Sequence, residues 1–276
     1  MVAKKDSKKM NSSKKQKNYV KYAKDNFQTW KSNHNEYERK VKDIIRIFGL
    51  KKDSKFNTKL SPKYWTGNID IKKPKVIIVS LNPGKSHNPS RKKEKDWKEF
   101  KERRENGMLS DGFQKSAYWL RIYKLVCGLD CKIPQKPMDG KYVLKNVLNL
   151  NLFPYHSKES EYFPSKFNIQ QLKTVLEHMH LLFYLIEEKK PEYCIFNGKV
   201  WETLLIKHQL SDVKFSKLKT IRKNSRNAKF GIYYGKKKGT RYVIFNKFLS
   251  RTNYYGITDI HLSKGIPQQI KKHYKK

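Results

Sequence analysis

Polar segments follow the ends of four short apolar runs, and they hold the residue types best suited to chemistry. These segments are Asn82-Pro83-Gly84 after residues 76–81, residues 151–157, Asn197-Gly198 after residues 193–196, and the stretch beyond Phe245. Amide and hydroxyl side chains carry both hydrogen-bond donors and acceptors, so they can hold water or a polar ligand. In α/β proteins, ligands bind outside the carboxyl ends of the strands. The sequence therefore predicts the functional site among these four loops.

A phosphate-binding loop is the first chemistry to consider, because Gly84-Lys85-Ser86 follows a predicted strand. The full pattern G-x-x-x-x-G-K-[ST] needs a glycine where Val79 stands. Pro83 also lacks a backbone N–H to donate to a phosphate. We therefore do not expect nucleotide hydrolysis.

Metal chemistry finds little support in the sequence. Cys127 and Cys131 have no second pair of ligands, and Cys194 stands alone, so we expect ordinary buried thiols. A metal-dependent nuclease would need paired carboxylates on adjacent strands with a nearby lysine. Asp70 with Lys72 lacks such a partner acid. We expect no metal and no cofactor, and the nuclease remains an alternative.

The composition predicts a folded protein with an anionic partner. The 276 residues include 63 Lys+Arg and 24 Asp+Glu, for a formal charge of +39, while 13% of the residues are aromatic. The aromatic residues indicate a packed core, which a disordered polycation would lack. The charge predicts surface self-repulsion unless a polyanion neutralises it, and nucleic acid is the polyanion that we expect.

We expect a cytoplasmic protein without a membrane span. The longest apolar run, near residues 181–186, is far shorter than the roughly 20 residues that a bilayer requires. The basic N-terminus has no apolar stretch after it, unlike a signal peptide. An odd number of cysteines without a framework pattern fits a reducing compartment. Residues 1–18 contain seven lysines and are predicted to form a disordered basic tail.

Apolar periodicity predicts alternating strands and helices. Buried strands are expected at 76–81, 146–153 and 193–196, and a hairpin is expected from 230–234 and 242–245 around a basic tip at 235–239. Helices are expected at 37–50, 117–126, 169–189, 199–207 and 266–276. This order predicts an α/β fold with a mostly parallel sheet. Residues 19–276 would form one domain, with a long charged insertion at 85–145.

The segment Leu81-Asn82-Pro83-Gly84 at a strand end resembles the first active-site motif of the uracil-DNA glycosylase superfamily. Its Asn-Pro-Gly form is similar to that of the mismatch-specific and single-strand-selective branches. Three further segments follow in the family's order: residues 117–124 resemble the helix after motif one, 149–154 the second strand, and 186–199 the helix–Pro–strand–Gly unit. The resemblance covers roughly residues 70–255. It implies a three-layer α/β/α sandwich with a central, mostly parallel four-stranded sheet.

The resemblance also implies an activity, which is excision of a base flipped out of double-stranded DNA. Asn82, stiffened by Pro83 and followed by Gly84, would hold the hydrolytic water against the sugar. Asn151 would read the Watson–Crick edge of the base, unless it only caps a turn. Phe113 or Phe153 would stack on the flipped base, unless these rings belong to the core. The enzyme would act as a monomer.

The second active-site motif, usually His-Pro-Ser, is degenerate here. One placement is Ser250-Arg251 after the hairpin, which lacks the histidine, and the other is His261-Leu262-Ser263, which keeps the His-x-Ser spacing. We favour the first placement and keep His261 as a catalytic candidate. Together with Lys85 and Ser86, Ser250 and Arg251 would bind the DNA phosphates. The basic tip Lys236–Lys238 would clamp the duplex.

The degenerate second motif and the long insertion favour a substrate other than ordinary uracil. We expect a damaged or hypermodified base, such as a glucosylated hydroxymethylcytosine of phage DNA, and a role in antiviral defence. A nucleic-acid-binding protein that keeps the fold without the chemistry is the main alternative.

Overall fold

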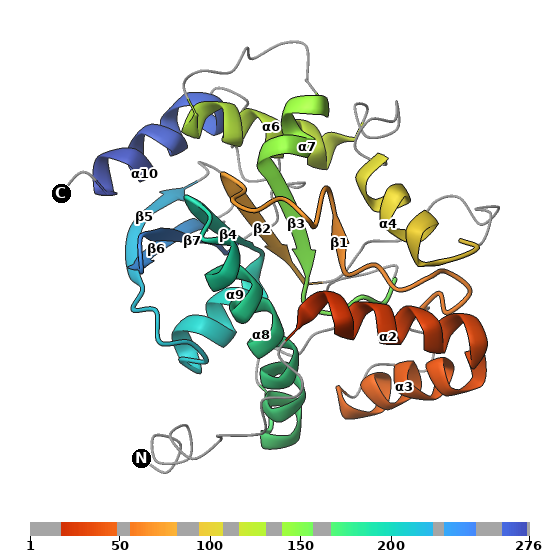
Figure 1. Ribbon diagram of the computed structural model, residues 1–276. Coiled ribbons are helices and arrows are strands. Elements are labelled where there is room, and N and C mark those ends of the chain that lie inside the picture. Colours follow the sequence, from red (N-terminus) through yellow and green to blue (C-terminus); the bar gives the residue numbers. More distant parts are fainter. Residues whose placement is uncertain are drawn as a thin grey trace.

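The computed structural model describes residues 18–48, 56–81, 94–106, 116–130, 140–156, 167–222, 229–246 and 261–274. Within these ranges the chain alternates helices and strands around one sheet (Figure 1). The predicted basic tail lies outside the described residues, except for Asn18. Asn18 caps the first described helix, because its side-chain oxygen accepts from the N–H groups of Val20 and Lys21.

The described sheet has seven strands in the order β1-β3-β2-β4-β7-β6-β5. Their bounds are β1 Trp65–Thr66, β2 Val76–Ser80, β3 Val147–Asn151, β4 Tyr193–Asn197, β5 Ser216–Arg222, β6 Lys229–Lys237 and β7 Thr240–Phe245. β3, β2, β4 and β7 are mutually parallel, whereas β1, β6 and β5 pair antiparallel. The fold is therefore α/β with a mixed sheet. The expected four strands are too few, because two antiparallel edges extend the parallel centre.

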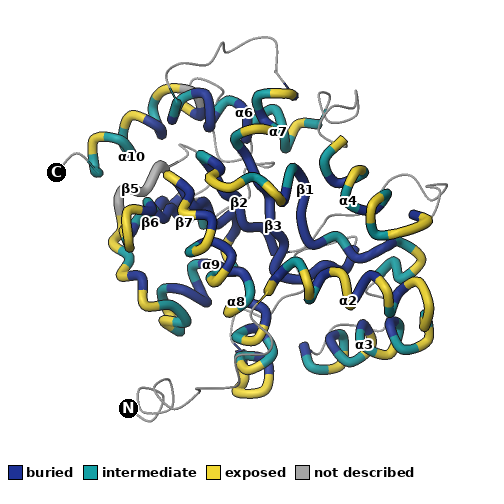
Figure 2. The backbone as a smooth tube through the Cα atoms, viewed as in Figure 1, coloured by how far each residue is buried: buried dark blue, intermediate teal, exposed yellow. Residues whose placement is uncertain are grey.

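The central strands are apolar on both sides, as a strand buried between two layers must be. Every residue of β2, β3 and β4 is buried. Along β2, Ile77 and Val79 belong to one apolar cluster, while Val76 and Ile78 belong to a second cluster on the opposite face. The sheet therefore separates two cores (Figure 2).

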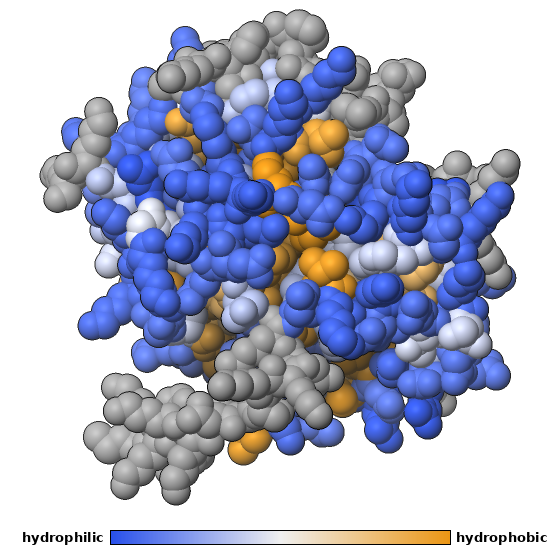
Figure 3. All heavy atoms as spheres, in the orientation of Figure 1, coloured by the Kyte–Doolittle hydropathy of each residue, from blue (hydrophilic) through white to orange (hydrophobic). Residues whose placement is uncertain are grey.

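Different helices fill the two cores. The first contains residues from α2 (Tyr19–Ser32), α3 (His34–Ile47), α4 (Trp97–Asn106), α8 (Ile169–Lys189), α9 (Lys199–Trp201) and the adjoining π-helix η2 (Glu202–Lys207). The second contains residues from α6 (Ala117–Leu129), α7 (Gly140–Asn146), the π-helix η4 (His261–Gly265) and α10 (Ile266–Tyr274). In Figure 3 hydrophilic residues cover most of the visible surface, and hydrophobic atoms gather in a narrow band between the helices.

Helix α8 has the bounds that its apolar stripe predicts. Asn168 and Gln171 form a capping box at its start, and the last turn ends at Lys190 in the left-handed conformation before Pro191. Helix α2 was not predicted, because charged and polar residues interrupt its apolar face. Its buried side chains include Phe27 and Trp30, which pack with α4 and with the loop before β1.

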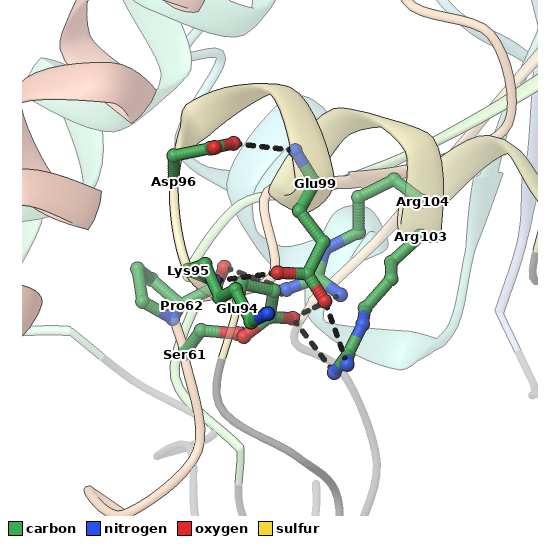
Figure 4. A network of polar contacts seen from close by, with 8 residues as sticks. All are labelled: Ser61, Pro62, Glu94, Lys95, Asp96, Glu99, Arg103 and Arg104. Carbon is green, nitrogen blue, oxygen red and sulfur yellow. Dashed lines mark hydrogen bonds and ion pairs between the residues drawn. The ribbon is translucent and has the colours of Figure 1, made fainter.

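A buried ion pair fixes α4 against the chain before β1 (Figure 4). Arg104 is 4% exposed, lies 3.5 Å from the carboxylate of Glu94, and donates to Ser61 Oγ at 2.8 Å. Its guanidinium also lies 4.3 Å from the ring centroid of Phe100. This part of the predicted charged insertion therefore packs on the core.

The hairpin of β6 and β7 is confirmed, but its turn is tighter than expected. β6 continues to Lys237 and β7 starts at Thr240, so only Lys238 and Gly239 form the turn. Both have positive φ, 48° and 85°, as a two-residue type I′ turn requires. Gly235 to Lys237 are strand residues.

Candidate functional site

Three neutral side chains meet near the carboxyl ends of adjacent parallel strands. Ser80 is the last residue of β2, Asn197 is the last residue of β4, and Asn149 lies two residues before the end of β3. Side chains two residues apart on a strand face the same side of the sheet. Ile78, Val147 and Ile195, each two residues earlier in the same three strands, belong to the second core, which contains α6. Ser80, Asn149 and Asn197 therefore face α6 as well. All three are buried, at 8%, 1% and 5% exposure for Ser80, Asn197 and Asn149.

Tyr118, in the first turn of α6, joins this cluster through its hydroxyl. The hydroxyl lies 3.0 Å from Ser80 Oγ and donates to Asn149 Oδ1 at 3.1 Å. Ser80 Oγ donates to the same Asn149 oxygen at 3.3 Å. A side-chain hydrogen bond also links Tyr118 to Asn197. One phenol therefore connects β2, β3 and β4.

The cluster stays uncharged at neutral pH. Burial raises the pKa of Tyr118 to about 12, and its hydrogen bonds with Ser80 and Asn197 oppose only part of that rise. The phenol is therefore protonated and can donate. Neutral groups of this kind can orient a ligand by hydrogen bonds, but they supply no strong base.

The chain leaving β2 is held firmly up to Leu81. The N–H groups of Leu152 and Phe153 donate to the carbonyls of Ser80 and Leu81, at 2.9 and 2.8 Å. Leu81 is 1% exposed. The described part of this segment therefore ends at a well-anchored residue directly after Ser80.

Most of the predicted site residues lie outside the described part of the chain. These are Asn82, Pro83, Gly84, Lys85, Ser86, Phe113, Ser250 and Arg251. Cys131 also lies outside it.

Asn151 is placed differently from its predicted role. Its Nδ2 donates to the Lys63 carbonyl at 2.8 Å, and its backbone N–H donates to the Tyr64 carbonyl at 2.8 Å. The residue is 2% exposed. Its amide group thus ties β3 to the segment that precedes β1, and the amide that faces the candidate site is Asn149. The sequence Asn149-Leu150-Asn151 contains two asparagines that would face the same side of a strand, and it does not indicate which of the two belongs to the candidate site.

Phe153 belongs to the core. It is 1% exposed, and its ring packs 5.6 Å from Phe48 and 4.9 Å from His178, measured between ring centroids. No face of the ring is open for stacking on a base. Tyr118 is a partly exposed aromatic residue of the cluster, and its ring centroid lies 5.3 Å from that of Trp119, which is also partly exposed.

His261 is an exposed residue at the start of η4, and Leu262 beside it is buried. η4 packs against α6, the helix that carries Tyr118, and leads into α10. The His-x-Ser segment is therefore helical rather than the end of a strand.

The basic hairpin tip lies at the opposite end of the sheet from the cluster. Thr240 starts β7 beside the start of β4, whereas Phe245 ends it beside Asn197. Lys237 pairs with Glu187 and with Asp212, the latter at 2.8 Å. Residues 236–238 therefore lie away from the candidate site, and their expected role in clamping the duplex or tracking along it stays a prediction.

Other cations at this amino-terminal end are also paired with acids. Lys75, just before β2, pairs with Asp130, and Arg241 pairs with Glu192 at 2.7 Å. These ion pairs neutralise part of the positive charge at the end of the sheet that is remote from Ser80.

Among the described residues, no three His, Cys, Asp or Glu side chains gather as metal ligands would. Cys127 and Cys194 are buried cysteines that form no disulfide, and burial raises the pKa of Cys127 to about 11, so the Cys127 thiolate is scarce at neutral pH. Asp70 pairs with Lys101.

No helix in the described ranges has both the length and the apolar character needed to cross a bilayer. Comparison with models of protein families and with curated proteins finds no significant match for this chain.

Proposed function

We propose that this protein is a DNA glycosylase that hydrolyses the N-glycosidic bond of a damaged or modified base flipped out of double-stranded DNA. The observation that carries the proposal is the hydrogen-bonded cluster of Ser80, Tyr118, Asn149 and Asn197 at the carboxyl ends of three parallel strands. Ligands of α/β folds bind at this edge. The amide and hydroxyl groups of this cluster can donate to and accept from the edge of a base.

The order of the parallel strands supports the same proposal. β2 lies at the centre, β3 and β4 flank it, and β7 follows β4, so all the loops singled out in the sequence leave the same edge. The helices on the two faces suit the three-layer sandwich that the resemblance implies. The sheet reaches seven strands by its antiparallel edges, outside that parallel unit.

The proposed mechanism assigns the water to Asn82. A neutral amide can orient a water molecule without removing its proton, which is sufficient when the base departs before the water attacks. Leu81, which precedes Asn82 in the sequence, is anchored because its carbonyl accepts from the Phe153 N–H at 2.8 Å. Donors fixed in the folded protein would then stabilise the negative charge on the departing base.

The net charge of the protein indicates the class of its binding partner. A net charge of +39 suits a polyanion, and cations at the amino-terminal end of the sheet are paired with acids such as Asp130, Glu187 and Glu192. DNA bound at the carboxyl end would meet cations without displacing those pairs. We propose a monomeric cytoplasmic enzyme, acting in antiviral defence on a hypermodified cytosine.

The test is release of free bases from a panel of natural and phage-modified DNAs, followed by mass spectrometry. The wild type should release one base, Asn82→Ala should release none while still binding DNA, and EDTA should have no effect. Asn68→Ala is the matched control, because Asn68 caps a turn before β2 by accepting from the Asp70 N–H at 2.8 Å. A wild type that binds DNA but releases no base from any sample would favour the non-catalytic alternative, and EDTA-sensitive strand cleavage would favour a nuclease.

A further inference from the structure

Strands β5 and β6 form a two-stranded ribbon that continues past the point where the parallel strands end. Phe245, the last residue of β7, pairs with Ile232 of β6. β5 and β6 form three further residue pairs beyond Ile232, and the last of these joins Arg222 to Lys229. At about 3.4 Å per residue, the ribbon extends roughly 10 Å beyond the end of β7. The connection at residues 223–228 lies outside the described residues.

The ribbon ends on two cations that lie opposite each other in register. These are Arg222 on β5 and Lys229 on β6. Like charges at directly opposite positions of an antiparallel pair destabilise it. The chain supplies no acid to this part of the sheet, because no Asp or Glu occurs between Asp212 and Asp259 in the sequence. An anion bound beside the two cations would remove this repulsion.

The other end of β6 also carries opposed cations, but there the protein itself offsets their charge. Lys236 lies opposite Arg241. Arg241 pairs with Glu192 at 2.7 Å. Lys237, next to Lys236, pairs with Asp212 at 2.8 Å. Acids of neighbouring segments therefore neutralise the amino-terminal end of the ribbon, whereas the segment that forms its carboxyl-terminal end contains none.

We propose that the end of the β5–β6 ribbon marked by Arg222 and Lys229 binds the phosphates of duplex DNA, about half a helical turn away from the base that enters the candidate site. The inference rests on the proposed function for the partner being double-stranded DNA. β6 is the third strand and β5 the fourth strand from β2 in the sheet (Figure 1). At about 4.8 Å per strand, they lie roughly 14–19 Å from Ser80 along the edge of the sheet. A strand of DNA rises about 3.4 Å per nucleotide, so this distance corresponds to roughly four to six base pairs.

Phosphate contacts position a protein on the duplex without reading its sequence. The ribbon would therefore orient DNA over the carboxyl ends of β2, β3 and β4, whichever base the protein removes. Each cation that neutralises a phosphate adds about 0.9 to the slope of log K against log salt. Arg222 and Lys229 should together account for about 1.8 of this slope.

The experiment measures DNA affinity by fluorescence anisotropy across a salt series, with two duplexes that contain a central tetrahydrofuran abasic nucleotide. The long duplex extends about ten base pairs to each side of this nucleotide and the short one about three, so only the long one reaches the ribbon. The double variant Arg222→Gln/Lys229→Gln should lower the slope by about 1.8 with the long duplex and leave it unchanged with the short one. Raising the salt from about 50 to 200 mM should therefore weaken long-duplex binding roughly tenfold more in the wild type than in this variant.

The matched control is Lys214→Gln/Lys236→Gln, which removes two exposed lysines at the amino-terminal end of the sheet. The Lys214 carbonyl lies beside Gly235, at that end of β6. Both double variants lower the net charge by the same amount, so a difference between them reports position. The control should keep the slope of the wild type.

A charge reversal separates a DNA contact from a role in folding. Arg222→Glu replaces the like-charged pair with Lys229 by an opposite-charged one, so it should unfold at the same or a higher urea concentration than the wild type. It should nevertheless bind the long duplex more weakly. A merely structural role for Arg222 would leave the salt slope unchanged in every variant that folds.

An unchanged slope with the long duplex in Arg222→Gln/Lys229→Gln, an equal loss with the short duplex, or an equal loss in the control overturns the inference. Base release from modified DNA is measured in parallel. The expected loss of slope without release of any base by the wild type supports the inference and contradicts the glycosylase. Release of a base by a protein whose slope does not depend on Arg222 and Lys229 does the opposite.

Discussion

The Tyr118 hydroxyl donates to Asn149 Oδ1 at 3.1 Å, and this bond connects the first turn of α6 to β3 across the end of β2. Both groups are neutral, and Ser80 completes a triangle with them. Three pairs of atoms in this triangle lie within hydrogen-bonding distance, but the two hydroxyl groups have only two protons to donate. The arrangement is therefore sensitive to the loss of any one member.

The first prediction separates the two asparagines of β3. Asn151→Ala should lower the free energy of unfolding by about 1 kcal/mol, because the bond from Nδ2 to the Lys63 carbonyl is lost. It should leave the release of bases from DNA unchanged, whereas Asn149→Ala, which removes a member of the candidate site, should slow that release. Urea unfolding and mass spectrometry of the released bases measure the two effects. Slower release in Asn151→Ala but not in Asn149→Ala would restore the role predicted from the sequence.

The second prediction concerns acid stability and His178. This histidine is 8% exposed, its Nδ1 donates to the Thr174 carbonyl at 3.0 Å, and its buried Nε2 has no hydrogen-bond partner among the described residues. Burial therefore lowers its pKa below the usual value near 6.5, and the hydrogen bond to Thr174 offsets only part of this effect.

His178 has a lower pKa in the folded protein than in the unfolded chain. Between these two pKa values, the unfolded chain binds more protons than the folded protein does. Stability should fall as the pH drops below about 6.5, by up to about 1.4 kcal/mol per pH unit. Urea unfolding at pH 7.5 and pH 5.0 should show a smaller difference for His178→Gln than for the wild type. His180→Gln, an exposed position on the same helix, should behave as the wild type does. Equal pH dependence in all three proteins would rule out His178 as the cause.

The third prediction concerns the buried pair of Arg104 and Glu94. Arg104→Leu should destabilise the protein by about 3–5 kcal/mol, because Glu94 at 7% exposure keeps a charge without this partner. Adding Glu94→Gln should recover part of the loss, a coupling that a double-mutant cycle measures. Arg46→Leu removes an exposed pair with Asp43 and should cost less than about 1 kcal/mol. No coupling between positions 94 and 104 would contradict the burial of the pair.

The fourth prediction separates the two ends of the sheet by DNA affinity. Lys199 is exposed and directly follows Asn197-Gly198 at the carboxyl end of β4. Lys199→Gln should weaken DNA binding and reduce the slope of log K against log salt by about 0.9. Lys237→Gln, at the opposite end and paired with Glu187 and Asp212, should leave that slope unchanged. Fluorescence anisotropy across a salt series measures both slopes, and the reverse order of effects would place DNA at the amino-terminal end.

Local patterns predict the elements that are apolar throughout or regularly striped. Residues 76–80 and 169–189 are such cases, because burial on both faces and a 3.6-residue period are properties of the segment itself. Helix α2 escaped prediction because lysines and other polar residues interrupt its apolar stripe. The edge strands β1 and β5 were also missed, since the pairing that defines them comes from distant segments.

The candidate site is only partly predictable for the same reason. The alternation along β3 places Asn149 and Asn151 on one face, so the sequence alone gives no reason to choose between them. The two asparagines differ because the amide of Asn151 donates to the carbonyl of Lys63, a residue 88 positions away in the chain that pairing of β1 with β3 brings close. Likewise, Tyr118 belongs to a helix predicted from its apolar face, and only the packing of α6 on the sheet brings its hydroxyl to Ser80.

The most direct test of the central claim is a time course of free-base release from phage DNA containing glucosylated hydroxymethylcytosine, followed by mass spectrometry, with wild type and Asn82→Ala side by side. The account predicts that the wild type releases the modified base in the presence of EDTA, and that Asn82→Ala binds the DNA equally well but releases none. Equal release by the two proteins, or no release of any base from this or other modified DNA by a wild type that binds it, would contradict the account.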